Sequence, residues 1–242
     1  MALPGILRTP IGDPLAAHRL PFDHSFMTQR SDRLRACAAS SGGFSLIEMM
    51  MVVGIIGVLV AITVPMSGNT IRYVKLSGDA RELSNATAVA KMRAAARFTK
   101  ARLFINRADG TFQVQTYTRA VALPHCPVVD AWCAEGVNPT SLSSTVTFGY
   151  GPVSSPPPFT QTSIDQAAMC QNNASPPVDI ANSSCIIFNS RGIPVDNTGS
   201  PIGLDAVYVT DGIAVYGITV AATGFIRNWK TNSTSTPLWT LQ

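Results

Sequence analysis

An apolar run from Phe44 to Met66 constrains the fold of this 242-residue chain more than any other feature. The run is 23 residues long and carries a single charged residue, Glu48. At a rise of about 1.5 Å per residue, a helix of this length spans about 30 Å, which is the thickness of a bilayer core. A buried core helix rarely runs this far without polar residues. The sequence therefore predicts a membrane-spanning helix over 44–66.

The residues before the run distinguish it from a secretory signal peptide. A signal peptide has a shorter apolar region, and the small residues of its cleavage site follow that region. Here the small residues 40–43 come first, so we expect cleavage on the cytoplasmic side, and we consider a cut after Gly43. Glu48 would then lie one helical turn from a new N-terminus at Phe44. A carboxylate near lipid needs a partner, and we expect the terminal amine of the same or a neighbouring copy.

The sequence Gly-Phe-Ser-Leu-Ile-Glu at 43–48, followed by an apolar helix, resembles the type III signal of type IV prepilins and type II secretion pseudopilins. The resemblance implies cleavage between Gly43 and Phe44 by a prepilin peptidase, which also N-methylates Phe44. It implies that Glu48 serves in assembly with other pilins or pseudopilins on an inner-membrane platform. Pro65 resembles the proline that kinks the pilin helix, since proline removes a helix hydrogen bond.

The same resemblance makes residues 1–43 a cytoplasmic prepilin leader, which is long for this family. Met27 offers a second start, from which the leader has 17 residues and three arginines. Such a basic stretch is retained in the cytoplasm by the positive-inside rule. We therefore expect a single-pass inner-membrane protein with its head in the periplasm, and a filament after assembly.

Four cysteines follow the apolar run, namely Cys126, Cys133, Cys170 and Cys185. An even number in an exported chain predicts disulfides, and three pairings exist. We favour Cys126–Cys133 and Cys170–Cys185, because both would staple local segments that lack regular periodicity. The spacings of seven and fifteen residues do not fit a zinc site, and only His125 is nearby. No metal or other cofactor is expected.

The rest of the chain predicts an α+β fold. Apolar and small residues recur at three- and four-residue steps and predict an amphipathic helical stem over 67–100; they are Leu76, Ala80, Leu83, Thr87, Ala90, Ala94 and Phe98. A periplasmic β-rich head should follow over 101–242. Strands are expected at 102–107, 111–119, 145–150, 185–189, 206–210, 213–221 and 225–229. The overall prediction is a long transmembrane-plus-amphipathic helix packed on an antiparallel β-sheet head, as in pilins.

The head contains two segments that resemble the GspH/FimT branch of minor pilins. They are the F-x-x-x-G sequence at 188–192 and the V-x-x-x-G-x-x-R sequence at 220–227. Some FimT-type members bind DNA through a G-R-x-R motif. In this chain Phe225 replaces the first arginine of that motif, so only Arg227 and Lys230 remain as DNA contacts. Residues 102–242 also carry six basic against eight acidic residues, so nucleic acid is not an expected partner.

Catalysis is not expected, because one histidine after the cleavage site leaves no catalytic or multi-histidine metal site. The sequence predicts a minor pilin or pseudopilin, a structural subunit that assembles into or primes a type II secretion pseudopilus or type IV pilus. One alternative is a FimT-like DNA-binding minor pilin for DNA uptake. Another is a signal-anchored periplasmic domain with no role in a filament.

Overall fold

The computed structural model describes residues 43–119, 126, 128–136 and 138–242, apart from the side chains of 64–67 and 69. The predicted leader lies outside these residues except for Gly43, and so do the second start at Met27 and His125. The side chain of Pro65 also lies outside the description, although its backbone belongs to a helix.

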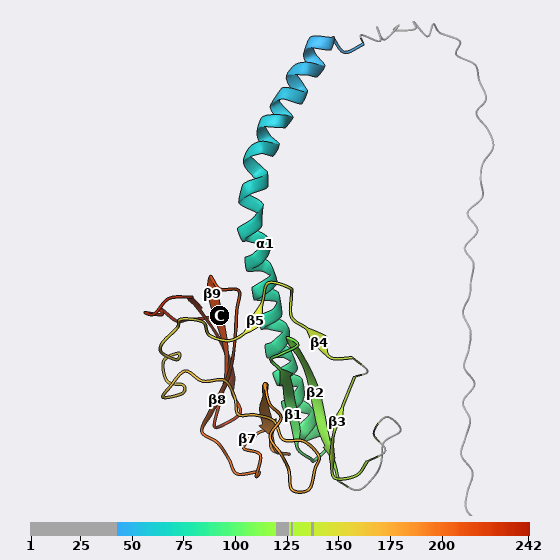
Figure 1. Cartoon of the computed structure of the whole chain (residues 1–242), viewed down its shortest axis with the longest axis vertical. Coiled ribbons are helices and arrows are strands. Elements are labelled where there is room, and N and C mark those ends of the chain that lie inside the picture. Colours follow the sequence, from blue (N-terminus) through green and yellow to red (C-terminus); the bar gives the residue numbers. More distant parts are fainter. Residues whose placement is uncertain (1–42, 120–125, 127, 137) are drawn as a thin grey trace, which may run out of the picture. The chain divides into compact units, whose positions relative to one another are not determined.

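One helix, α1 (Leu46–Ala96), joins the helical segments predicted at 44–66 and 67–100 without a break between them, although it ends before the predicted end of the stem (Figure 1). It begins where the Ser45 carbonyl accepts hydrogen bonds from the backbone N–H groups of Glu48 and Met49. It ends before Phe98, which has a φ of 51° and a side chain that is 83% exposed. The prediction that Phe98 continues the buried stripe was wrong, because the left-handed backbone turns it away from the helical repeat.

Two antiparallel sheets follow the helix, which confirms the predicted α+β class. The first sheet has the strand order β3-β2-β1-β6-β7, with β4 paired to β2, and the second has the order β11-β10-β9-β8-β5. The strands are β1 (Ala101–Asn106), β2 (Thr111–Thr118), β3 (Ala131–Ala134), β4 (Thr140–Ser141), β5 (Thr147–Phe148), β6 (Ser183–Phe188), β7 (Pro194–Val195), β8 (Leu204–Thr210), β9 (Ala214–Ala221), β10 (Ile226–Asn232) and β11 (Thr240–Leu241).

The main core lies where the second part of α1, which carries buried residues from Leu76 to Ala94, meets both sheets; Figure 1 shows this part of the helix beside β1 and β2. The helix contributes the predicted stripe, with Leu76, Ala80, Leu83, Ala90 and Ala94 all buried. The sheets contribute alternate strand residues: Leu103, Ile105, Ile186, Phe188, Val207, Val209, Ile218 and Val220. Alanine in the stripe lets the helix approach the sheets closely, so one helix face covers parts of two sheets.

Within the described part of the chain, loops rather than a second helix cover the outer faces of the two sheets. On the second sheet, Tyr208 packs with Val153, Ile164 and Trp239. On the first sheet, Ile187 packs with Cys170 and Val195. The loop-rich region predicted at 120–183 therefore has a packing role, although β3 and β4 were not expected within it. These strands form by pairing with β2, a contact that local sequence does not show.

Candidate functional site

The first part of α1 exposes its apolar side chains. Residues Leu46–Thr63 have a mean hydropathy of 2.5, and none of them is buried. Ile47, Met51 and Val53 are 63–74% exposed. Within the residues that the structure describes, this is the one helical segment long and apolar enough to cross a membrane. Removal of apolar surface from water is favourable by about 25 cal/mol of free energy per Å², so the segment is suited to packing against lipid or other apolar helices.

The predicted processing and assembly residues lie at the start of this helix. Gly43 and Phe44 precede α1 as irregular backbone, and the Phe44 ring is 78% exposed. Glu48 lies in the first turn of α1 with its side chain exposed. A carboxylate in a first helical turn lies close to the positive end of the helix dipole.

The two head segments at 188–192 and 220–227 meet at the helical stem. Gly192 and Gly224 both have positive φ values, 73° and 75°. A Cβ atom on Gly224 would clash with the Gly192 carbonyl oxygen, and one on Gly192 would lie 2.9 Å from the Lys91 Cε. Lys91 Nζ also donates a hydrogen bond of 2.9 Å to the Gly224 carbonyl oxygen. Two turns that are distant in sequence are thus joined to one helix residue.

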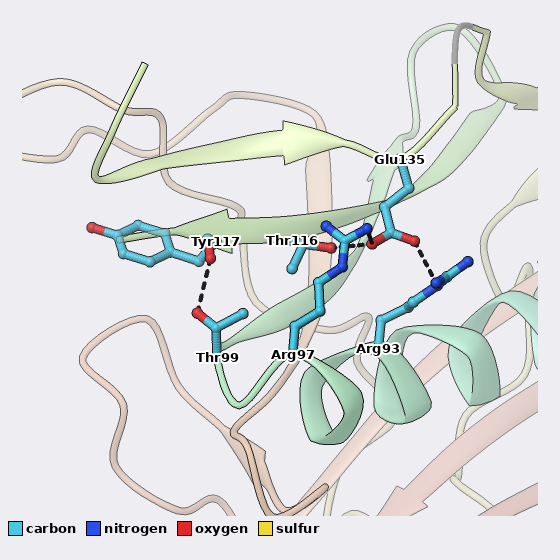
Figure 2. A network of polar contacts seen from close by, with 6 residues as sticks. All are labelled: Arg93, Arg97, Thr99, Thr116, Tyr117 and Glu135. Atoms are coloured by element: carbon cyan, nitrogen blue, oxygen red, sulfur yellow. Dashed lines mark hydrogen bonds and ion pairs between the residues drawn. The ribbon is translucent and has the colours of Figure 1, made fainter. Parts of the chain in front are cut away.

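Glu135 joins the end of α1 to the first sheet, a role that sequence reasoning missed (Figure 2). Its Oε2 lies 2.7 Å from the Arg93 Nε, and its Oε1 lies 3.3 Å from the Arg97 Nη2. The Thr116 hydroxyl donates a further hydrogen bond to Oε1. Arg93 lies in the last turn of α1, and Arg97, four residues later, follows the helix end. This spacing in the sequence was the available signal for an acidic partner.

The structure contains both favoured disulfides, Cys126–Cys133 and Cys170–Cys185. The first links the segment before β3 to β3 itself, and the second links a loop to β6. Cys133 on β3 is the cross-strand neighbour of Thr116 on β2 in the first sheet. The two bridges therefore fix segments of low periodicity to the same sheet.

The two candidate DNA contacts do not form one basic patch. Arg227 and Lys230 lie three residues apart on β10, so their side chains point to opposite faces of the second sheet. Lys230 lies on the face toward α1, with its Nζ 4.3 Å from the centre of the Tyr73 ring. The Arg227 guanidinium lies 5.4 Å from the centre of the Phe225 ring. Each cation thus already has an aromatic neighbour.

The described residues contain no group of three or more His, Cys, Asp or Glu side chains that could hold a metal ion. Asp205 on β8 is a buried carboxyl group, and burial raises its pKa to about 7. Its Oδ1 accepts a hydrogen bond from the backbone N–H of Ala206. Comparison of the chain with protein-family models, with curated proteins and with solved structures gave no match.

Proposed function

We propose that this chain is a minor pilin or pseudopilin, a subunit that assembles into or primes a type II secretion pseudopilus or a type IV pilus. One observation carries the proposal: α1 is a single helix with an exposed apolar first part and a second part buried against two sheets. Such a helix anchors a folded head and leaves an apolar surface for lipid or for other helices.

Each signal residue has a role in this proposal. A prepilin peptidase cuts between Gly43 and Phe44 and N-methylates Phe44. In the assembled state the Glu48 carboxylate pairs with the Phe44 amine of a neighbouring copy, because an unpaired charge in an apolar bundle is unfavourable. Pro65 lies within α1 and bends it in this role. The protein acts by assembly rather than catalysis, from the inner membrane with residues 101–242 in the periplasm.

DNA uptake is the alternative function raised by the C-terminal hairpin. Tight binding to DNA requires several cations that reach phosphates on one surface. Arg227 and Lys230 lie on opposite faces of β10, and Lys230 packs on Tyr73 of the helix. This arrangement favours assembly over nucleic-acid binding.

The test is co-purification of the full-length chain with the other pilins of its host. We expect Glu48→Val to insert in the membrane, since the change removes a charge, but to lose the co-purifying pilins. Met49→Val, a neutral change at the next position, is the matched control and should retain them. Equal recovery of pilins with both variants would contradict an assembly role for Glu48.

Processing distinguishes this proposal from a signal-anchored domain with no filament role. Mass spectrometry of the wild-type protein should show an N-terminus at N-methylated Phe44. Gly43→Arg should leave the precursor uncut, because only a small residue is expected to fit the peptidase next to the membrane. An uncleaved wild-type chain, or an efficiently cleaved Gly43→Arg variant, would support the signal-anchored alternative.

A further inference from the structure

A cavity of about 320 Å³ lies between the outer face of the first sheet and the loop 171–177. Its volume is within the range of about 300–1,000 Å³ that is usual for small-molecule sites. The lining combines two aromatic rings, two cations, one carboxylate and several side-chain amides. None of these residues belongs to the proposed assembly segment, so the cavity has no role in the function described above.

The walls of this cavity are fixed by bonds on both sides. The Cys170–Cys185 disulfide attaches the loop to β6. Asn173 Oδ1 accepts a 2.8 Å hydrogen bond from the backbone N–H of Trp132, so the loop is also attached to β3. Asn172 Oδ1 accepts hydrogen bonds from the backbone N–H groups of Ala174 and Val178, which fix the turn of the loop. A preformed cavity avoids part of the entropy loss on binding.

The aromatic part of the lining is held in place by a buried cation. Trp132 on β3 and Tyr117 on β2 are cross-strand neighbours, with their ring centres 5.3 Å apart. The Arg102 guanidinium lies 4.2 Å from the Trp132 ring centre and donates hydrogen bonds to the side chain of Gln115 and the carbonyl oxygen of Gln171. The face of an aromatic ring carries partial negative charge and attracts the C–H groups of a sugar ring.

The polar part of the lining has unused donors and acceptors. Among the described residues, Lys100, Arg119 and Asp130 make no ion pair. The Gln171 side-chain amide likewise makes no hydrogen bond with any described group. A hydroxyl group both donates and accepts, whereas a bare anion only accepts, so this mixed lining matches hydroxyl groups. Two cations against one carboxylate leave a positive charge for one acidic substituent.

We propose that this cavity binds an acidic saccharide, that is, a sugar ring that bears a carboxylate. Trp132 and Tyr117 pack against the ring, and Asp130 and the side-chain amide of Gln171 bind its hydroxyl groups. Lys100 and Arg119 bind the carboxylate by charge-assisted hydrogen bonds. This proposal is independent of pilin assembly, because it involves only the head of the protein.

The experiment uses the full-length chain in phospholipid nanodiscs, which contain no sugar-based detergent. A glycan array with matched acidic and neutral oligosaccharides identifies the preferred glycan, and calorimetry measures its affinity together with that of acetate. We expect the acidic glycans to bind more tightly than their neutral counterparts, and acetate to bind weakly. Equal binding of acidic and neutral glycans, or no binding of any acidic glycan, would overturn the proposal. Acetate binding as tight as the glycan would also overturn it, because an anion site would then be sufficient.

Two variants assign the binding to this cavity. Arg119→Ala should weaken binding of the preferred glycan at least about tenfold, through loss of a charge-assisted hydrogen bond. Arg191→Ala removes an exposed arginine outside this cavity and should leave the affinity unchanged. Trp132→Ala should abolish binding. If the tryptophan variant does not fold, Lys100→Ala tests the same cavity, and it should weaken glycan binding through loss of its charge-assisted hydrogen bond. Equal affinities of Arg119→Ala and Arg191→Ala would place any binding elsewhere.

Discussion

The two parts of α1 are both rich in apolar residues, yet they meet different surroundings. In the first part, Leu46–Thr63, apolar residues occur on every side of the helix and none is buried. In the second part, Leu76 and Leu83 belong to one buried stripe, and charged residues occupy the other sides. A single apolar stripe is buried when a sheet packs against that face of the helix, whereas a helix that is apolar on all sides needs an apolar environment all around it.

Polar contacts strengthen this difference. Asp79 of the second part accepts hydrogen bonds from the backbone N–H and the hydroxyl of Ser143, at 2.9 and 3.0 Å. Lys91 bonds to the Gly224 carbonyl oxygen, and Arg93 forms an ion pair with Glu135. The stem therefore behaves as part of the head in folding, while the apolar part is free to serve another partner.

The largest expected effect is on the free energy of unfolding, and it should differ between two leucines of the same helix. Leu83→Ala should lower the free energy of unfolding of the head by about 2–5 kcal/mol, because it leaves a cavity in the core. Leu59→Ala should leave that stability unchanged, since Leu59 is 58% exposed in the apolar part. Chemical denaturation of the full-length protein in nanodiscs measures both. A similar loss for both variants would show that the apolar part also contributes to folding of the head.

A second prediction concerns how the stability of the head depends on pH through Asp205, which lies on β8 of the second sheet. Asp205 has a pKa of about 7 in the folded protein, above its usual value near 4, because it is buried. Its contribution to stability is therefore complete below about pH 4 and is lost as the pH rises through 7. Between about pH 5 and pH 8, wild-type stability should fall by about 3 kcal/mol relative to Asp205→Asn.

Parallel denaturation curves of the wild-type and Asp205→Asn proteins at several pH values provide this measurement. The difference between the two proteins isolates Asp205 from the other groups that titrate in the same range. A constant difference across the pH range would show that Asp205 is ionised in the folded protein at all of these pH values.

The smallest predicted effect concerns the Glu135 contact at the end of the stem. Glu135→Gln should lower the free energy of unfolding by about 1 kcal/mol, because Arg93 and Arg97 are partly exposed and solvent weakens the ion pairs. The loss should decrease at high salt concentration. Glu82→Gln is the matched control, since Glu82 is an exposed stem residue with no ion pair among the described residues. Equal stabilities of the two variants would leave Glu135 without this role.

The local sequence pattern was sufficient to predict several elements of the fold. The hairpin predicted at 102–107 and 111–119 corresponds to β1 and β2 within one residue at each end. Alternation of buried residues such as Phe112 defines the strands, and Gly110 with a φ of 64° provides the turn. Because these signals involve neighbours in sequence, they can be predicted without knowledge of the rest of the fold.

Other elements depended on distant partners. The strand predicted at 145–150 is shorter in the structure, where β5 has two residues, both paired with β8. β3 lies in a region of irregular sequence and exists through its pairing with β2. Trp132, on this strand, became a candidate binding residue only once Arg102 and the loop 171–177 were placed around it.

The sequence by itself determined the membrane-length helix, the buried stripe of the stem and the alternation of the main strands. These features follow from helical and strand periods, which act over a few residues. The tertiary structure alone decided that Gly192 and Gly224 meet at Lys91, and that Glu135 meets the two arginines of the stem. Such contacts join residues tens of positions apart, and they depend on strand register and loop closure, which no local period encodes.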